Sequence, residues 1–179
     1  MSGQAVTLRS LTAADAQAYW ETRNQGLLEF PDAFTTTYEE GRATAPEVLA
    51  QRIASDGDDF VLGAFDTADT LLGYAGFQRE TRVKQRHKGK VLGMYVVPAA
   101  RGSGLGKRLL LDLITRVRKL DGMELLVLTV THSNEAARQL YLSTGFVSFG
   151  VEPNAIKVDG ASYAKEHMAL RLKDPAAHT

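Results

Sequence analysis

The most constraining feature of the sequence is a glycine-rich turn between an apolar segment and a long amphipathic segment. Residues 90–97 are largely apolar and end at Pro98, as expected of a strand buried on both faces. Over residues 104–120, Leu105, Leu109, Leu113 and Val117 recur at helical spacing. Glycines in such a turn expose backbone N–H groups, and the helix start adds unpaired donors and a favourable dipole. The arrangement predicts an anion site, above all one for a phosphate.

Two common phosphate motifs do not fit this turn. A P-loop requires a first glycine where Arg101 stands, and a hydroxyl for magnesium where Arg108 stands. The dinucleotide pattern fails because Lys107 occupies the place of its last glycine. A nucleotide-phosphate binder is therefore disfavoured, although it stays open as an alternative.

The rest of the chain predicts an α/β domain with a mixed sheet, mostly antiparallel at its start and end. Residues 90–130 form a strand–helix–strand unit, which gives a parallel pair with a right-handed crossover. We expect one domain over residues 1–172, a frayed tail over 173–179, an irregular segment over 29–45 and a turn at Asp159–Gly160. Strands are predicted at 6–9, 60–65, 71–80, 90–97, 125–130, 146–151 and 167–172, and helices at 13–28, 46–55, 104–120 and 134–144.

Composition excludes several chemistries. The chain has no cysteine, so disulfides, thiolate metal sites and a cysteine nucleophile are excluded, whereas a serine intermediate is not. Its four histidines form no close pair at metal-ligand spacing, so we expect no metal. The formal net charge of +0 argues against a nucleic-acid surface. We see no membrane-spanning run and no secretory signal, and we expect a cytoplasmic protein.

The basic residues of 82–90 form either a solvated hairpin tip or a rim that attracts an anion.

Two segments of the chain resemble the GNAT superfamily of acetyl-CoA-dependent N-acetyltransferases. The first is Arg101-Gly102-Ser103-Gly104-Leu105-Gly106, placed directly after a central strand and before the long helix. The second, residues 134–146, resembles the downstream helix of the family, with an asparagine, a tyrosine and a closing Gly-Phe. The resemblance covers residues 6–172, is concentrated in 91–146 and is loose in the N-terminal third. It implies a mostly antiparallel sheet of six to seven strands flanked by about four helices.

The resemblance also implies acetyl-CoA as co-substrate and direct attack by a neutral amine on the acetyl carbonyl. Strand backbone would hold the pantetheine arm, the glycine-rich loop the pyrophosphate, and an asparagine either the pantetheine or nearby backbone. The residues assigned in this way are Tyr95, Val96, Val97, Arg101, Gly102, Ser103, Gly104, Leu105, Gly106, Lys107 and Asn134.

For proton transfer, the resemblance places Tyr141 as the acid that protonates the leaving CoA thiolate. A phenol with a pKa near ~10 is protonated at neutral pH, so it suits that role, although a packed core tyrosine is the alternative. Glu80 is our first candidate for the base that deprotonates the amine. Glu29 and Glu152 are the other candidates, and each of the three carboxylates is otherwise an ordinary surface or binding group.

The resemblance implies an acceptor site between the first helices and the later strands, with residues 29–34 as one wall. Glu29, Phe34 and Glu152 are its candidate residues, with the loop over 152–163 as a wall. Phe34 and Tyr163 either stack on the substrate or belong to the core. His87 and His167 titrate near neutral pH in principle, but isolated histidines are more often structural.

Three functions remain open at this point. The first is acetylation of a small-molecule amine, which we favour because no strongly acidic run suits a polycation. The second is acetylation of a protein N-terminus or lysine. The third is a non-catalytic acyl-CoA-binding regulatory module. Dimerisation is common in the family, and a homodimer is compatible with these residues without being established by them.

Overall fold

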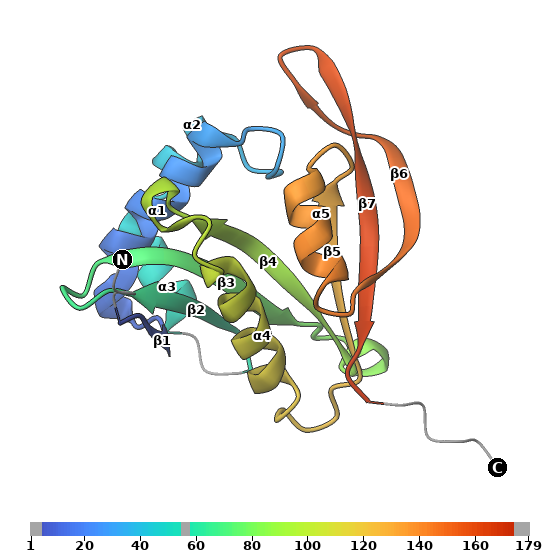
Figure 1. The fold of residues 1–179 in the computed structure, drawn as a ribbon, viewed down its shortest axis with the longest axis horizontal. Helices are drawn as coiled ribbons and strands as arrows, with labels where there is room; N and C mark the ends of the chain where they lie inside the picture. The colour runs from blue at the N-terminus through green and yellow to red at the C-terminus, as the bar shows by residue number, and fades with distance from the viewer. Residues whose placement is uncertain (1–4, 55–57, 174–179) are drawn as a thin grey trace.

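Seven strands form one sheet in the computed structural model, which describes residues 5–54 and 58–173. Their order across the sheet is β1-β2-β3-β4-β5-β7-β6 (Figure 1). Every neighbouring pair in this sheet is antiparallel except β4 and β5, which run parallel. The strands are β1 (Thr7–Ser10), β2 (Phe60–Phe65), β3 (Leu71–Arg79), β4 (Lys88–Val96), β5 (Leu125–Thr131), β6 (Val147–Val158) and β7 (Ala161–Arg171).

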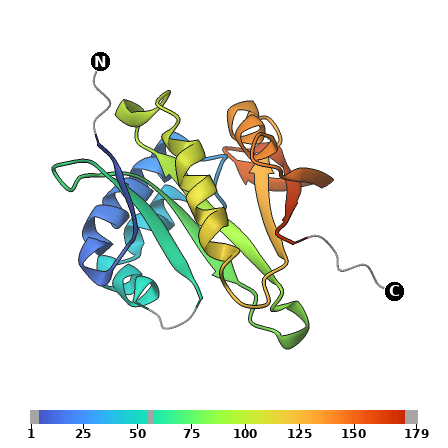
Figure 2. The same ribbon diagram turned by 60° about the horizontal axis from the view of Figure 1, so that its bottom comes forward.

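Helices cover both faces of the sheet. Helix α4 crosses one face of β2–β4, and α1 and α3 lie against the other (Figure 2). The described helices are α1 (Ala16–Glu29), α2 (Tyr38–Ala43), α3 (Pro46–Ile53), α4 (Leu105–Val117) and α5 (Glu135–Leu142). Mixed α/β architecture with a parallel strand–helix–strand unit is therefore confirmed.

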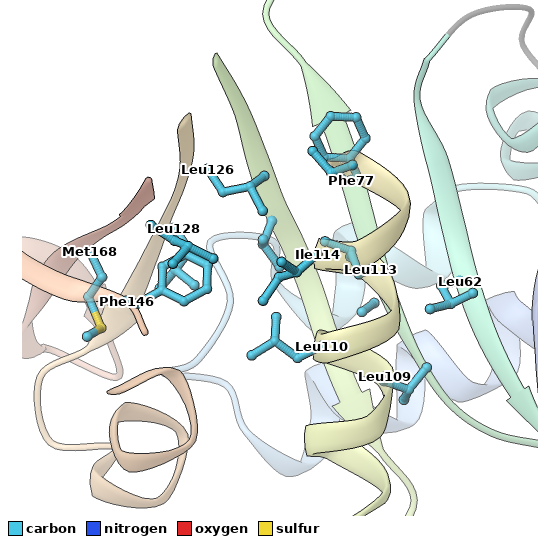
Figure 3. Packing of buried hydrophobic residues seen from close by; sticks show 14 of the residues in the cluster. Leu62, Phe77, Leu109, Leu110, Leu113, Ile114, Leu126, Leu128, Phe146 and Met168 are labelled. Atoms are coloured by element: carbon cyan, nitrogen blue, oxygen red, sulfur yellow. The ribbon is translucent and has the colours of Figure 1, made fainter. Parts of the chain in front are cut away.

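Helix α4 carries the apolar stripe that its sequence predicts. Leu109, Leu113 and Val117 are fully buried, and each contributes about 1.5–3 kcal/mol by leaving water. They share one core cluster with Leu62 and Phe77 from β2 and β3, and with Leu126, Leu128, Phe146 and Met168 on the other side (Figure 3). This packing joins the two parts of the sheet and fixes the start of α4.

The two parallel strands separate towards the start of α4. They pair only between Lys88–Lys90 and Leu125–Val127, although β4 continues to Val96 and β5 to Thr131. A bulge in β4 accompanies the separation, since Tyr95 lies opposite Tyr74 while Leu92 lies opposite Gly76. Gly93 takes the left-handed conformation there (φ +54°), which costs glycine little. The unpaired strand edges leave a gap beside the glycine-rich loop.

Two predictions about local structure were wrong. The segment 29–45 is not wholly irregular, because Thr37 and Glu40 form a capping box that starts the short helix α2. The segment 152–163 is not a loop, because β6 and β7 stay paired up to the predicted turn at Asp159–Gly160. Both turn residues have positive φ (+49° and +82°), as a two-residue hairpin turn requires.

Two further points concern a possible membrane span and the C-terminal tail. None of the helices in 5–54 and 58–173 is long and apolar enough to cross a membrane. Residues 174–179 of the predicted tail lie outside the described residues.

Candidate active site

The glycine-rich loop presents unpaired amides. Gly102 and Gly104 are left-handed (φ +74° and +78°), and α4 begins directly after Gly104. Arg101 N–H donates to Pro98 and Arg108 N–H to Gly104, but the N–H groups of residues 102–107 have no acceptor among the residues that the structure describes. A Cβ added at Gly102 or Gly104 would meet no atom within 4 Å. The loop therefore has unpaired donors and open space beside two of its glycines, as an anion site requires.

A cleft of about 520 Å³ opens beside this loop, and we call it the helix-mouth cleft. Its walls are the end of β4, the start of α4, α5 and the segment after α1. The predicted site residues that line it are Phe34, Tyr95, Val96, Arg101, Gly102, Gly104, Leu105, Gly106, Lys107, Asn134 and Tyr141. The structure thus brings together residues spread over more than a hundred positions of the sequence.

A smaller cavity of about 90 Å³, the strand gap, lies between the separated ends of β4 and β5. Phe34, Asn134 and Tyr141 line both the helix-mouth cleft and the strand gap. The cleft therefore continues into the space between the two parallel strands.

Two residues assigned to the cofactor are used by the protein itself. Val97 N–H donates to the Leu72 carbonyl at 2.9 Å, which prolongs the pairing of β3 with β4. The Ser103 hydroxyl donates to the Ala100 carbonyl at 2.7 Å. Neither residue lines the cleft, so the Val97 amide and the Ser103 hydroxyl, as placed here, are not free to bind a ligand.

Arg101 is held by Glu29 rather than left pointing at a ligand. Its guanidinium binds both carboxylate oxygens of Glu29, with Nη2 and Oε2 2.8 Å apart. Its Nε donates to the Val96 carbonyl at 2.9 Å. The Tyr95 hydroxyl also donates to Glu29, at 2.7 Å. This cluster of Glu29, Tyr95 and Arg101, which we call the latch, ties the end of α1 to the glycine-rich loop.

The latch makes Glu29 a poor base. Arg101, together with the Tyr95 hydroxyl, lowers the pKa of Glu29, because both stabilise the ionised carboxylate. Burial, reinforced by the Glu29 charge, raises the pKa of Tyr95 to about 12. Glu29 does not line the helix-mouth cleft, so its prediction as an acceptor-site residue is not supported by its position.

Helix α5 presents Asn134 and Tyr141 to the cleft. The Asn134 side chain caps the helix by accepting from Ala137 N–H at 3.1 Å. Tyr141 is half-buried, its ring packs edge-on against Phe146, and its hydroxyl has no hydrogen-bond partner in the described part of the chain. Desolvation raises the pKa of Tyr141 to about 12. The phenol thus holds its proton at neutral pH, as an acid must.

The structure does not bring Glu80 or Glu152 to the cleft. Glu80 follows the end of β3 and binds Lys90 Nζ at 2.7 Å, near the start of β4. Strand β4 has nine residues, which separates Glu80 from the glycine-rich loop by ~25 Å. Glu152 lies on the β6–β7 hairpin and contacts His167 Nε2 at 3.1 Å. The basic segment 82–90 lies at the Glu80 end, so it is not a rim of this cleft.

Sequence analysis missed Lys165 and Thr131. Lys165 is buried on β7, and its Nζ donates to the carbonyls of Asp32 and Ala33 (3.2 and 2.9 Å) and to Thr131 Oγ1 (2.9 Å). Thr131 Oγ1 in turn donates to the Asp32 carbonyl at 2.6 Å. These bonds fix the segment that carries Phe34 against β5 and β7. A lysine in an alternating strand predicts a solvent-facing side chain, so no local signal marks it.

A larger cavity of about 690 Å³, the α1 pocket, lies on the opposite face of the sheet. Residues of α1, α3, β3 and β4 line it, among them Tyr19, Arg23 and Tyr74. Phe34 lines this pocket, the strand gap and the helix-mouth cleft. Leu92 and Gly93 line both the α1 pocket and the strand gap, so the three spaces adjoin one another.

The described residues contain no group of three or more His, Asp or Glu side chains that could hold a metal ion. The polar groups that line the cleft are amides, the Arg101 guanidinium, the Lys107 ammonium and phenols. A sheet that separates at a parallel pair, beside a helix that opens with free amides, defines the class of acyltransferases that the sequence resemblance implied.

The chain belongs to the acetyltransferase (GNAT) family, whose sequence profile matches residues 25–146. It is 33% identical over 156 residues to the N-alpha-acetyltransferase RimI of Mycobacterium tuberculosis, covering 87% of each chain. It is 32% identical over 151 residues to the mycothiol acetyltransferase of Salinispora tropica, which covers 83% of this chain and 47% of the relative. The chain thus spans about half the length of that relative.

Solved structures show the same fold. A Salmonella typhimurium structure that contains its cofactor acetyl-CoA superposes with a TM-score of 0.77 and 26% identity, covering 98% of both chains. The names of these relatives differ in their acceptors, so they do not identify the acceptor of this chain.

Proposed function

We propose that this protein transfers the acetyl group of acetyl-CoA to a primary amine of a small molecule. The observation that carries the proposal is the set of unpaired N–H groups at residues 102–107, which open onto a cleft that also contains Tyr141. Family membership supports acetyl-CoA as the ligand whose pyrophosphate these amides hold. A thioester is already activated, so the task of the site is placement.

In the reaction, the amine nitrogen attacks the thioester carbonyl carbon. A C–N bond forms, the C–S bond breaks, and the CoA thiolate takes a proton from the Tyr141 hydroxyl. The phenolate then recovers a proton from solvent or from the ammonium formed by the attack. The high pKa of Tyr141 supports this role, because the proton is present when the thiolate leaves.

Water, rather than Glu80, is our proposal for the first proton acceptor of the amine. Among the described residues that line the three spaces, Asp59 is the only carboxylate, and its Oδ1 accepts Arg79 N–H at 2.8 Å. A chain of water molecules through the α1 pocket takes the ammonium proton to solvent. This replaces the sequence-based assignment of Glu80, whose side chain pairs with Lys90.

The α1 pocket supports a small acceptor over a protein. It has walls from two helices and three strands and adjoins the strand gap through Phe34. A ligand pocket of this size suits a small organic molecule. Acetylation of a protein N-terminus is the second candidate, favoured by the similarity to the RimI relative.

A thiol-release assay tests the proposal. The purified protein is mixed with acetyl-CoA and a panel of small amines, and free CoA thiol is followed with a thiol reagent. The chain has no cysteine, so the reagent detects CoA alone. We expect acceleration by at least one amine. If acetyl-CoA binds but neither an amine nor an N-terminal peptide increases thiol release, the protein is a non-catalytic acyl-CoA-binding module instead.

A further inference from the structure

The α1 pocket contains a guanidinium, that of Arg23, which forms no ion pair within residues 5–54 and 58–173. Arg23, on α1, is half-buried and lines the pocket. Its Nη1 is buried beside Gly41 of α2 and has no hydrogen-bond partner. Within the described residues, no carboxylate forms an ion pair with it. A partly buried charge left in this state is costly, because it has lost water without gaining an acceptor.

Besides the unpartnered Asn24 Oδ1, which lies with Arg23 Nη1 beside Gly41, the surroundings of Arg23 include two tyrosines. Tyr19 and Tyr74 line the same pocket, and their rings pack edge to face with centroids 4.9 Å apart. Neither hydroxyl has a hydrogen-bond partner in the described part of the chain. The charged residues that line the pocket are Arg23, Arg52 and Asp59, and Asp59 already accepts a backbone N–H. The pocket therefore presents two tyrosine hydroxyls as donors beside the Arg23 guanidinium.

We propose that the acceptor amine also carries a carboxylate or another acidic group, and that Arg23 binds this group in the α1 pocket. The inference rests on the proposed function and specifies its substrate class. A planar guanidinium binds two oxygens of a carboxylate or phosphonate at once. Tyrosine hydroxyls beside it supply further donors.

Because the three spaces adjoin one another, they define how the proposed substrate is oriented. Phe34 lines all three, and Leu92 and Gly93 lie where the α1 pocket meets the strand gap. An amine placed at the strand gap reaches the thioester, while the acidic end of the same molecule lies towards α1. Arg23 determines which substrate binds and does not contact the reacting atoms. Removing its side chain should therefore weaken the binding of acidic acceptors selectively.

The test compares matched acceptors that differ only in charge. Amino acids and ω-amino carboxylates of increasing length are each paired with the corresponding amide, and kcat/KM is measured for both members. Charge-assisted hydrogen bonds contribute about 1.5–3 kcal/mol, so we expect the wild-type protein to prefer the best carboxylate by about 10–100-fold. A preference of this size requires no variant, so it does not depend on the folding of a mutant.

Substitutions then locate the effect. Arg23→Met should abolish the preference by raising KM for the carboxylate while leaving kcat/KM for the amide within about twofold; Arg23→Lys should retain part of it. Arg118→Met, at an exposed arginine beyond the end of α4, is the matched control and should retain the full preference.

Two results would overturn the inference: equal kcat/KM for every carboxylate and its amide, or an equal fall for both members in Arg23→Met. In either case turnover of amines would still stand, so the proposed function would survive. Absence of turnover with every acceptor, despite acetyl-CoA binding, would instead remove the function and the inference with it.

Discussion

The side chain with the most specific role is Tyr141. Its position on α5 follows from the apolar spacing that places Ala137, Leu140 and Tyr141 against the core and the cleft. What the structure adds is that its hydroxyl has no internal acceptor in the described residues. The proposed acid thus has its proton available for a ligand.

Replacing Tyr141 by phenylalanine removes that proton and little else. General acid catalysis contributes about 10²–10⁴-fold, so we expect Tyr141→Phe to lower kcat by this order and leave acetyl-CoA affinity almost unchanged. Steady-state kinetics with calorimetric titration of CoA measures both. Glu80→Gln is the control, since Glu80 pairs with Lys90 and should leave kcat and the pH–rate profile unmoved. Equal turnover of Tyr141→Phe and wild type would refute the acid role.

The latch predicts a pH-dependent contribution to stability. Arg101 lowers the pKa of Glu29 in the folded state, so the folded protein binds fewer protons there than the unfolded chain. The stabilisation is complete above the ordinary glutamate pKa of about 4.3 and disappears as pH falls through the lowered folded-state value. Glu29→Gln should therefore unfold at lower temperature than wild type at neutral pH.

Thermal unfolding of both proteins across pH tests the latch. The difference between the two midpoints should shrink below about pH 4. A difference that stays constant across the whole range would show that the Glu29 charge does not stabilise the fold. Tyr95→Phe retains the Glu29–Arg101 pair, so it should preserve most of the pH dependence.

Residues that belong to a local sequence pattern could be assigned to the candidate site from the sequence. Gly102, Gly104 and Tyr141 belong to patterns tied to one turn or one helix, and the structure places all three at the cleft. Glu80 does not line the cleft, because it follows the far end of β3, and the sequence alone does not say which end of a strand lies near the cleft. Arg23 belongs to no sequence motif. It stands out only because no carboxylate among the described residues pairs with it, which the sequence alone does not reveal.

At the level of elements, the segment between α1 and α2 determines the shape of the site. It carries Phe34 and is bound to β5 and β7 through Lys165 and Thr131. Helix α2 itself has only six residues, too few for a helical period to be recognised, and its signal was the capping box at Thr37. The β6–β7 pairing was underestimated because apolar alternation in 152–163 is confined to two three-residue stretches, 156–158 and 161–163. Backbone pairing with the neighbouring strand needs no such alternation.

Lys165→Met tests the role of this link. The change leaves the Ala33 carbonyl without its lysine donor, whereas the Asp32 carbonyl keeps the Thr131 hydroxyl. An unsatisfied buried group costs about 1–3 kcal/mol. We expect a lower free energy of unfolding and faster hydrogen exchange over residues 30–37, measured by denaturant titration and mass spectrometry. Lys157→Met, at an exposed lysine of the same hairpin, is the control. Unchanged exchange in Lys165→Met would mean that the segment is held by other contacts.

At the scale of the whole molecule, one core joins two parts of a sheet that separate where the ligand is expected. Helix α4 belongs to the core cluster that includes side chains of both parts. Its buried leucines therefore fix the position of the unpaired amides at its N-terminus. The succession of strands and helices along the chain and the parallel crossover could be predicted from alternating strand and helix periods, whereas the order of strands across the sheet was not predicted. The separation of β4 from β5 could not, because it depends on where the hydrogen-bonded ladder stops. The homodimer stays a prediction, which sedimentation tests.

The central claim is that the amides of residues 102–107 hold the pyrophosphate of CoA. The most direct measurement is a two-dimensional ¹H–¹⁵N NMR titration of labelled protein with CoA, and with pantetheine, which lacks the diphosphate. The account predicts that CoA causes its largest backbone amide shifts in residues 102–107, and that pantetheine leaves those amides nearly unmoved while shifting β4. Largest CoA shifts elsewhere, or equal shifts of residues 102–107 with both ligands, would contradict it.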